Sequence, residues 1–199
     1  MSLIHREKTQ DLRVRRTHVL LRKALWELMT EQEFQSITVQ DIADHAMINR
    51  ATFYDHFMDK YALLDYAIRE QFKETLGAKL PEGSTFTAEN LALLLRTTGE
   101  YLLALRHGCK PKDHQLLPMV QTQITIAIGE ILTDWIKGLR TSRSVDAALV
   151  ATMTSWAIYG AAVYWSQQPD PDSPESFVAQ TLPTILASLQ QISNAPLSR

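Results

Sequence analysis

The chain has 199 residues, a formal net charge of −2 and a hydrophobic fraction of 45%, which excludes a globally disordered protein. Its single cysteine, Cys109, excludes a fold held together by internal disulfides. The N-terminus lacks the apolar run of a signal peptide, and the most apolar stretch, 156–165, is shorter than the roughly 20 residues of a membrane span. We therefore expect a cytoplasmic protein with no membrane partner.

Positive charge is concentrated at the N-terminus. Residues 1–23 contain seven Lys or Arg side chains and two acidic ones, while the remainder of the chain is acidic overall. A basic arm on an acidic protein is typical of contact with phosphate, and a solvated, frayed terminus explains it equally well.

Helical periodicity runs through nearly the whole chain, and no segment shows the sustained alternation of a strand. A first helix carries an apolar stripe that includes Leu21 and Leu25. After a break at 34–36, the pattern predicts two very short helices at 39–46 and 50–56, and a long one from about 60 to 80. The loop 81–84 ends that helix. We predict an all-α fold of about nine helices.

Four more helices are expected after residue 85. The segment 145–167 is apolar nearly all round, as in a helix buried on more than one side. In the last helix, apolar residues recur at steps of four and three, the spacing of a helix-packing seam, and Pro183 should bend it. Together these two helices suggest an unpaired apolar surface, with Trp165, Val178, Leu182, Ile185 and Leu189 as the candidate interface residues.

The most informative stretch is 37–57, where the two short helices follow each other directly. Thr38 and Asp41 have the spacing of a capping box, and Asn49 is a suitable N-cap for the second helix. Helices this short do not persist alone, so we expect them to pack on the helices before and after. Such a pair presents the N-terminal end of its second helix at a width that fits the DNA major groove.

These positions define the candidate DNA contacts. Residues at the start of the second helix would meet base edges, and residues near its end would meet phosphates. For Arg50 the alternative is a solvated helix position, and for Tyr54 it is a place in the core. The predicted set is Thr38, Asn49, Arg50, Ala51, Thr52, Tyr54, His56 and Lys60.

The motif Thr52-Phe53-Tyr54-Asp55-His56-Phe57, with Ile42, Ala43, Ala46 and Leu63-Leu64, resembles the signature of TetR-family regulators over residues 15–65. Residues 49–54 and 59–61 resemble a subgroup that includes regulators of dihydroxyacetone kinase genes. The family usually has glycine where this chain has Glu33 and Met47, which puts the local turn geometry in doubt.

The resemblance implies a helix-turn-helix domain at 1–60 and an effector-binding and dimerisation domain at 61–199. The protein would be a homodimer that binds a palindromic double-stranded operator, with repression as the default. An effector would tilt the fourth helix and so change operator affinity.

Aromatic and methionine residues of the second half either line an effector pocket or form plain core. The candidates are Tyr101, Met119, Trp135, Met153, Trp156 and Tyr159. We expect no cofactor, and His107, Cys109, Asp113 and His114 fit no zinc pattern. No catalytic constellation stands out, so we do not expect an enzyme. The alternatives are a regulator whose effector is a protein partner, and a helical ligand-binding protein or enzyme with a motif-like stretch.

Overall fold

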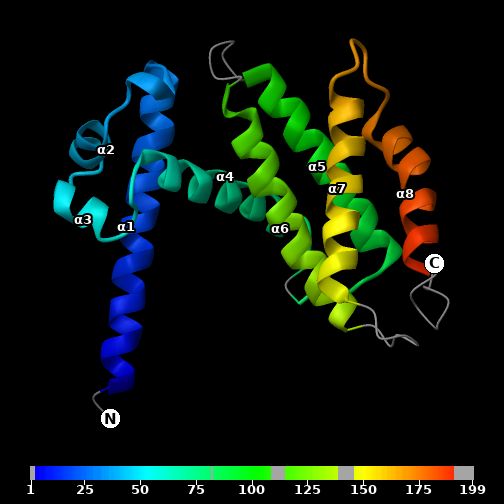
Figure 1. The fold of residues 1–199 in the computed structure, drawn as a ribbon, viewed down its shortest axis with the longest axis horizontal. Helices are drawn as coiled ribbons and strands as arrows, with labels where there is room; N and C mark the ends of the chain where they lie inside the picture. The colour runs from blue at the N-terminus through cyan, green and yellow to red at the C-terminus, as the bar shows by residue number, and fades with distance from the viewer. Residues whose placement is uncertain (1–2, 82, 109–114, 139–145, 191–199) are drawn as a thin grey trace. The chain divides into compact units, whose positions relative to one another are not determined.

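The computed structural model describes residues 3–81, 83–108, 115–138 and 146–190, with side chains from residue 12 to residue 189. All regular structure in these ranges is helical, which confirms the predicted all-α class. The described helices are α1 (Leu3–Glu31), the 3-10 helix η1 (Phe34–Ser36), α2 (Val39–His45), α3 (Arg50–Tyr54), α4 (Lys60–Gly77), α5 (Ala88–Gly108), α6 (Leu117–Lys137), α7 (Ala147–Ser166) and α8 (Pro174–Gln190) (Figure 1).

Two compact units make up the chain, and they meet inside one helix. The first, which we call the head, comprises residues 1–68, and the C-terminal unit comprises residues 69–199. The division falls between Ile68 and Arg69 in α4, whereas the sequence suggested a boundary at 60/61. α4 is therefore one continuous helix that contributes to both units.

The C-terminal unit has α7 at the centre of its helix packing. α7 contacts α5, α6 and α8, and it buries residues such as Ala151, Ile158 and Ala162 in their common core. None of its 20 residues is charged. By length and composition alone, α7 could cross a membrane. The apolar stretch 156–165, which is only part of α7, is too short to indicate this. One side of α7 packs against neighbouring helices, as in the core helix of a globular unit.

The predicted seam of α8 faces the core of its own unit. Ile185 and Leu189 are buried there together with Trp165 of α7, and Val178 and Leu182 are partly buried against the same core. Trp165, Ile185 and Leu189 are thus covered within their own unit, whereas Val178 and Leu182 remain partly accessible, and contact of this seam with a second copy stays a prediction. Spacing by four and three predicts that a helix packs, but it does not identify the surface on which it packs.

The head is built on α1, whose apolar stripe is buried as its spacing predicts. Leu21 and Leu25 are fully buried, and Ile42 of α2 and Phe53 of α3 join them in the core. α2 has seven residues and α3 has five, so neither helix would persist in isolation. Their stability therefore depends on tertiary packing, of α2 on α1 and of α3 on α2.

Lys60, the first residue of α4, binds the turn that joins α1 to α2. Its Nζ donates to the backbone carbonyl oxygens of Phe34 (2.9 Å), Gln35 (2.9 Å) and Ile37 (2.7 Å). The Nζ also lies 4.8 Å from the centroid of the Phe34 ring. Desolvation lowers the pKa of Lys60 below its usual value, and the nearby Asp41 carboxylate opposes that shift. Since an ammonium has three donors, all of them are used inside the head.

Lys60→Met retains the apolar part of the side chain and removes all three donors. We expect it to lower the free energy of unfolding of the head by about 1–3 kcal/mol, because partly buried carbonyl oxygens lose a charged partner. Amide hydrogen exchange in α1 and α2 measures this loss.

Lys23→Met is the matched control for this variant. Lys23 is exposed, and its ion pair with Glu27 spans 3.6 Å, so its removal should change the free energy of unfolding by less than about 1 kcal/mol. Equal losses of protection in the two variants would contradict the structural role of Lys60.

Candidate nucleic-acid interface

The capping box predicted at the start of α2 is present. The backbone amide of Asp41 donates to Thr38 Oγ1 (3.1 Å), and the backbone amide of Thr38 donates to Asp41 Oδ2 (2.8 Å). The Thr38 hydroxyl also donates to Asp41 Oδ2 (2.7 Å), and these bonds from Thr38 lower the pKa of the Asp41 carboxyl. The side chain of Thr38 is therefore part of the cap, and its contact with DNA stays a prediction.

The N-terminal end of α3 is capped and accessible. The backbone amide of Ala51 donates to Asn49 Oδ1 (2.8 Å), which confirms Asn49 as the N-cap. Asn49, Arg50 and Ala51 are exposed, and Thr52 is partly buried. The four candidates for base contact thus lie together at one end of α3, and none of them is required for the core of the head.

The turn between α2 and α3 has a left-handed backbone conformation at Met47, one of the two positions where the TetR family usually has glycine. Met47 has a φ of 55°, in the left-handed region that glycine occupies without strain, and its side chain is exposed. For a residue with a Cβ, this left-handed conformation is less favourable than the right-handed one by roughly 1–2 kcal/mol. Glu33 has a φ of −73°, an ordinary extended conformation, so that position does not require glycine. The turn therefore has a positive φ at this position even though the residue is methionine and not glycine.

Arg50 and Tyr54 lie one turn apart on the same exposed face of α3. Arg50 Nη2 donates to Tyr54 Oη (3.2 Å), and the guanidinium carbon lies 5.5 Å from the centroid of the Tyr54 ring. Tyr54 is about half exposed. The alternative of a core position for Tyr54 is therefore wrong, since Phe53 is the buried ring of α3.

His56 is partly buried where α1 comes close to the end of α3. Its ring meets the His18 ring of α1 edge-on, with centroids 5.1 Å apart, and His18 also contacts Phe57 (4.9 Å) and Tyr66 (4.8 Å). Phosphate contact by His56 and Lys60 stays a prediction. For Lys60, such a contact would replace one of its three bonds to backbone carbonyls.

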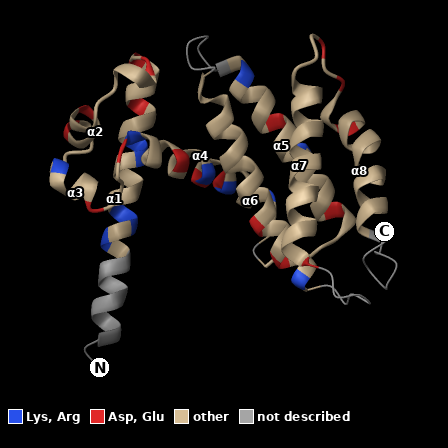
Figure 2. Cartoon of the chain, viewed as in Figure 1, with Lys and Arg blue, Asp and Glu red and all other residues tan. Residues whose placement is uncertain are grey.

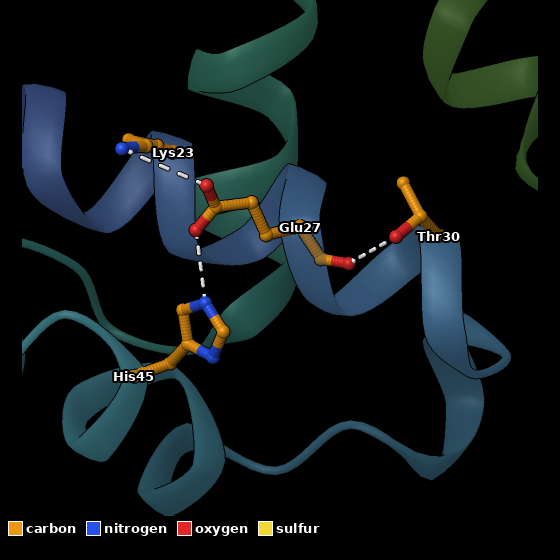
Figure 3. A network of polar contacts seen from close by, with 4 residues as sticks. All are labelled: Lys23, Glu27, Thr30 and His45. Atoms are coloured by element: carbon orange, nitrogen blue, oxygen red, sulfur yellow. Dashed lines mark hydrogen bonds and ion pairs between the residues drawn. The ribbon is translucent and has the colours of Figure 1, made fainter.

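A polar network ties α2 to α1 on the surface of the head (Figure 3). His45 Nε2 lies 2.9 Å from Glu27 Oε2, and Lys23 Nζ lies 3.6 Å from Glu27 Oε1. The hydrogen bond with His45 is the main reason that the pKa of Glu27 is lowered. The i,i+4 spacing of Lys23 and Glu27 is visible in the sequence, whereas no local pattern indicates that His45, 18 positions away, pairs with Glu27.

Basic residues, blue in Figure 2, lie close together on α1 just after the grey segment. Arg13, Arg15 and Arg16 are exposed there. The side chains of Arg6 and Lys8 lie outside the described residues. The described part of the basic arm is thus a solvent-accessible helical surface.

The six pocket candidates do not form one site. Tyr101, Trp135 and Tyr159 are buried in the core, and burial raises the pKa of Tyr101 to about 12 and raises that of Tyr159. Met119 is partly buried. Met153 and Trp156 are 65% and 50% exposed on α7, which corrects their assignment to an internal pocket.

Two open hollows of about 440 and 540 Å³ flank Trp165, and both include Asp172 of the loop between α7 and α8. None of the six pocket candidates lines either hollow.

Among the described residues, no group of three His, Cys, Asp or Glu side chains could hold a metal. Cys109, Asp113 and His114 lie outside those residues.

Residues 21–67 match the family described as bacterial regulatory proteins, tetR family. YxbF, an uncharacterized HTH-type transcriptional regulator of Bacillus subtilis (strain 168), is 39% identical over 97 residues. That alignment covers 45% of this chain and 26% of the relative, so the chain spans about a quarter of that protein's length. The family match includes α2, α3 and the first half of α4, which carry the candidate DNA contacts.

A similar solved structure shares the helical architecture. The TetR family repressor AlkX from Dietzia sp. strain DQ12-45-1b, implicated in biodegradation of n-alkanes, has a TM-score of 0.57 and 17% identity, covering 89% of this chain and 98% of that one. The dihydroxyacetone kinase operon activator DhaS has a TM-score of 0.48 and 21% identity, covering 89% and 98%. The predicted likeness to that subgroup is not confirmed. The family match over residues 21–67, the curated relative and the all-helical fold together support a transcriptional regulator of the tetR family.

Proposed function

We propose that this chain is a cytoplasmic repressor that binds a palindromic DNA operator as a homodimer, and that an effector in the C-terminal unit sets its operator affinity. The observation that carries the proposal is the capped, exposed start of α3. A helix end of this kind fits the major groove, where Asn49, Arg50, Ala51 and Thr52 would reach base edges. The exposed arginines of α1 would add contacts to phosphate.

The proposed dimer interface lies on the exposed side of α7. Leu149, Met153, Trp156 and Tyr164 are exposed there along successive turns of a helix without charged residues. Gly160 belongs to the same side, and a Cβ at that position would meet no atom within 4 Å. An uncharged face with large apolar residues is typical of an interface, and a twofold axis would bury it against its own copy.

The proposed coupling element is α4, which runs from the head into the C-terminal unit. Its residues Phe72 and Leu76 are buried in the C-terminal core, with the Phe72 ring 5.3 Å from that of Tyr101. On α6, Glu130 lies 2.7 Å from Lys73 Nζ and 3.7 Å from Arg69 Nη1. Because α4 is continuous, an effector that moves α5 or α6 would change the direction in which α4 leaves the unit.

Buried polar groups near this anchor support an effector site. Thr97 is fully buried on α5, and its hydroxyl has no hydrogen-bond partner among the described residues. Tyr101 lies one turn further along α5, and its hydroxyl is 3.5 Å from Gln71 Oε1. Buried polar groups usually have partners. Thr97 and Tyr101 would therefore suit a polar group on an effector that enters this core.

The first test contrasts two arginines of the head. Arg50→Ala should weaken binding to the selected operator by about 1–3 kcal/mol and relax the preference at one base position. Arg16→Ala should weaken binding to all sequences alike and reduce the log–log salt slope by roughly one unit per protomer. Fluorescence anisotropy with duplexes selected from a random pool measures both, after circular dichroism shows that the variants fold. Absence of salt-sensitive binding by the unchanged chain would refute the proposal.

The second test concerns assembly. Met153→Glu with Trp156→Glu should convert dimers to monomers at micromolar concentration, because two charges per chain would be buried in an apolar interface. Ile126→Glu on α6 is the matched control, since Ile126 is also an exposed apolar residue of this unit. Light scattering measures the oligomeric state. If the α7 variant is still a dimer, the interface does not lie on this side of α7.

The third test concerns the coupling element. Glu130→Gln removes both ion pairs of α4, and we expect operator affinity to fall about fivefold because α4 becomes less preorganised. Glu175→Gln is the control, since Glu175 pairs with Arg96 at 2.7 Å and does not involve α4. Operator affinity is measured by fluorescence anisotropy. If Glu130→Gln and the unchanged chain bind the operator equally well, Glu130 does not contribute to the coupling.

A further inference from the structure

Tyr54 is the last residue of α3 and Arg50 is the first, and the two side chains contact each other along the exposed face. The contact has two components: the hydrogen bond from Arg50 Nη2 to Tyr54 Oη (3.2 Å) and the position of the guanidinium 5.5 Å from the ring centroid. Both components act on the same group. Tyr54 therefore restrains the guanidinium of Arg50 through a hydrogen bond and through a cation–π contact.

The ring of Tyr54 is itself supported by the core. It meets the Phe53 ring edge-on, with centroids 5.6 Å apart, and Phe53 is fully buried against Phe57 (6.0 Å). A ring supported in this way has fewer accessible rotamers than one that projects freely into water. Tyr54 therefore offers Arg50 a fixed surface.

We propose that Tyr54 is a positioning residue for Arg50, so that it determines base preference and not only affinity for the DNA backbone. The inference rests on the proposed function of the head. A guanidinium has five N–H donors, and the bond to Tyr54 occupies one of them. The remaining donors suffice for a bidentate contact with O6 and N7 of guanine. A long arginine side chain loses considerable rotamer freedom on binding, and Tyr54 reduces that loss.

The same geometry accommodates a phosphate contact by Tyr54. Its oxygen accepts from Arg50, so its own O–H proton is available to donate to a phosphate oxygen. Tyr54 would then connect a phosphate on one side to the base-reading arginine on the other. A residue that contacts only phosphate would affect all sequences equally. The two roles therefore differ in a measurable way.

The test uses Tyr54→Phe, which keeps the ring and removes only the hydroxyl. Tyr61→Phe is the matched control, because the Tyr61 hydroxyl donates to Gln35 Oε1 (3.1 Å) elsewhere in the same head. Duplexes are first selected from a random pool with the unchanged chain. Binding of each variant is then measured by anisotropy on the selected duplex and on every single-base-pair change of it.

We expect Tyr54→Phe to reduce the discrimination at the position read by Arg50 by about fivefold, roughly the net contribution of one ordinary hydrogen bond. Discrimination at the other positions should persist, and Tyr61→Phe should leave the whole profile unchanged. In an Arg50→Ala background, Tyr54→Phe should cause no further loss of preference there, since the group that it positions is absent.

Two results would overturn the inference. If Tyr54→Phe weakens all sequences by one common factor and keeps every base preference, Tyr54 contacts phosphate without positioning Arg50. If the unchanged chain binds no duplex in a salt-sensitive manner, the proposed function fails and this inference fails with it. The profile of the unchanged chain distinguishes the two cases.

Discussion

In the head, a single ammonium group binds the turn between α1 and α2. The carbonyl oxygens of Phe34, Gln35 and Ile37 converge on Lys60, and partly buried carbonyl groups require such a partner. Lys60 also begins α4, where the backbone amide of Ala62 donates to Asp59 Oδ1 (2.8 Å). Asp59 thus caps the start of the connecting helix, and the adjacent Lys60 binds the turn that leads into α2.

The two units are stabilised in different ways. In the head, α2 and α3 are short and rely on caps, on the network around Glu27 and on Lys60. In the C-terminal unit, long helices bury apolar side chains around the uncharged α7. Directional polar contacts suit a surface that must present side chains at defined positions to DNA. A broad apolar core is compatible with the proposed roles of this unit in dimerisation and effector binding.

The sequence by itself determined the helical class and the local structure of the helix-turn-helix. The apolar stripe of α1 has the 3.6-residue period, and both caps, at Thr38 and Asn49, involve residues at most three positions apart. The left-handed conformation at Met47 was indicated by the resemblance to the TetR family, which usually has glycine at this position. These features depend on neighbouring residues, whose relative positions follow from backbone geometry.

Only the tertiary structure decided which apolar surfaces are covered and which polar groups meet. The α8 seam is buried within its own unit, and Met153 and Trp156 are exposed on α7, although periodicity describes both helices equally well. Lys60 meets the turn at Phe34, and His45 meets Glu27, across 26 and 18 positions. Such contacts depend on how helices pack in three dimensions, and the period of one helix carries no information about its neighbours.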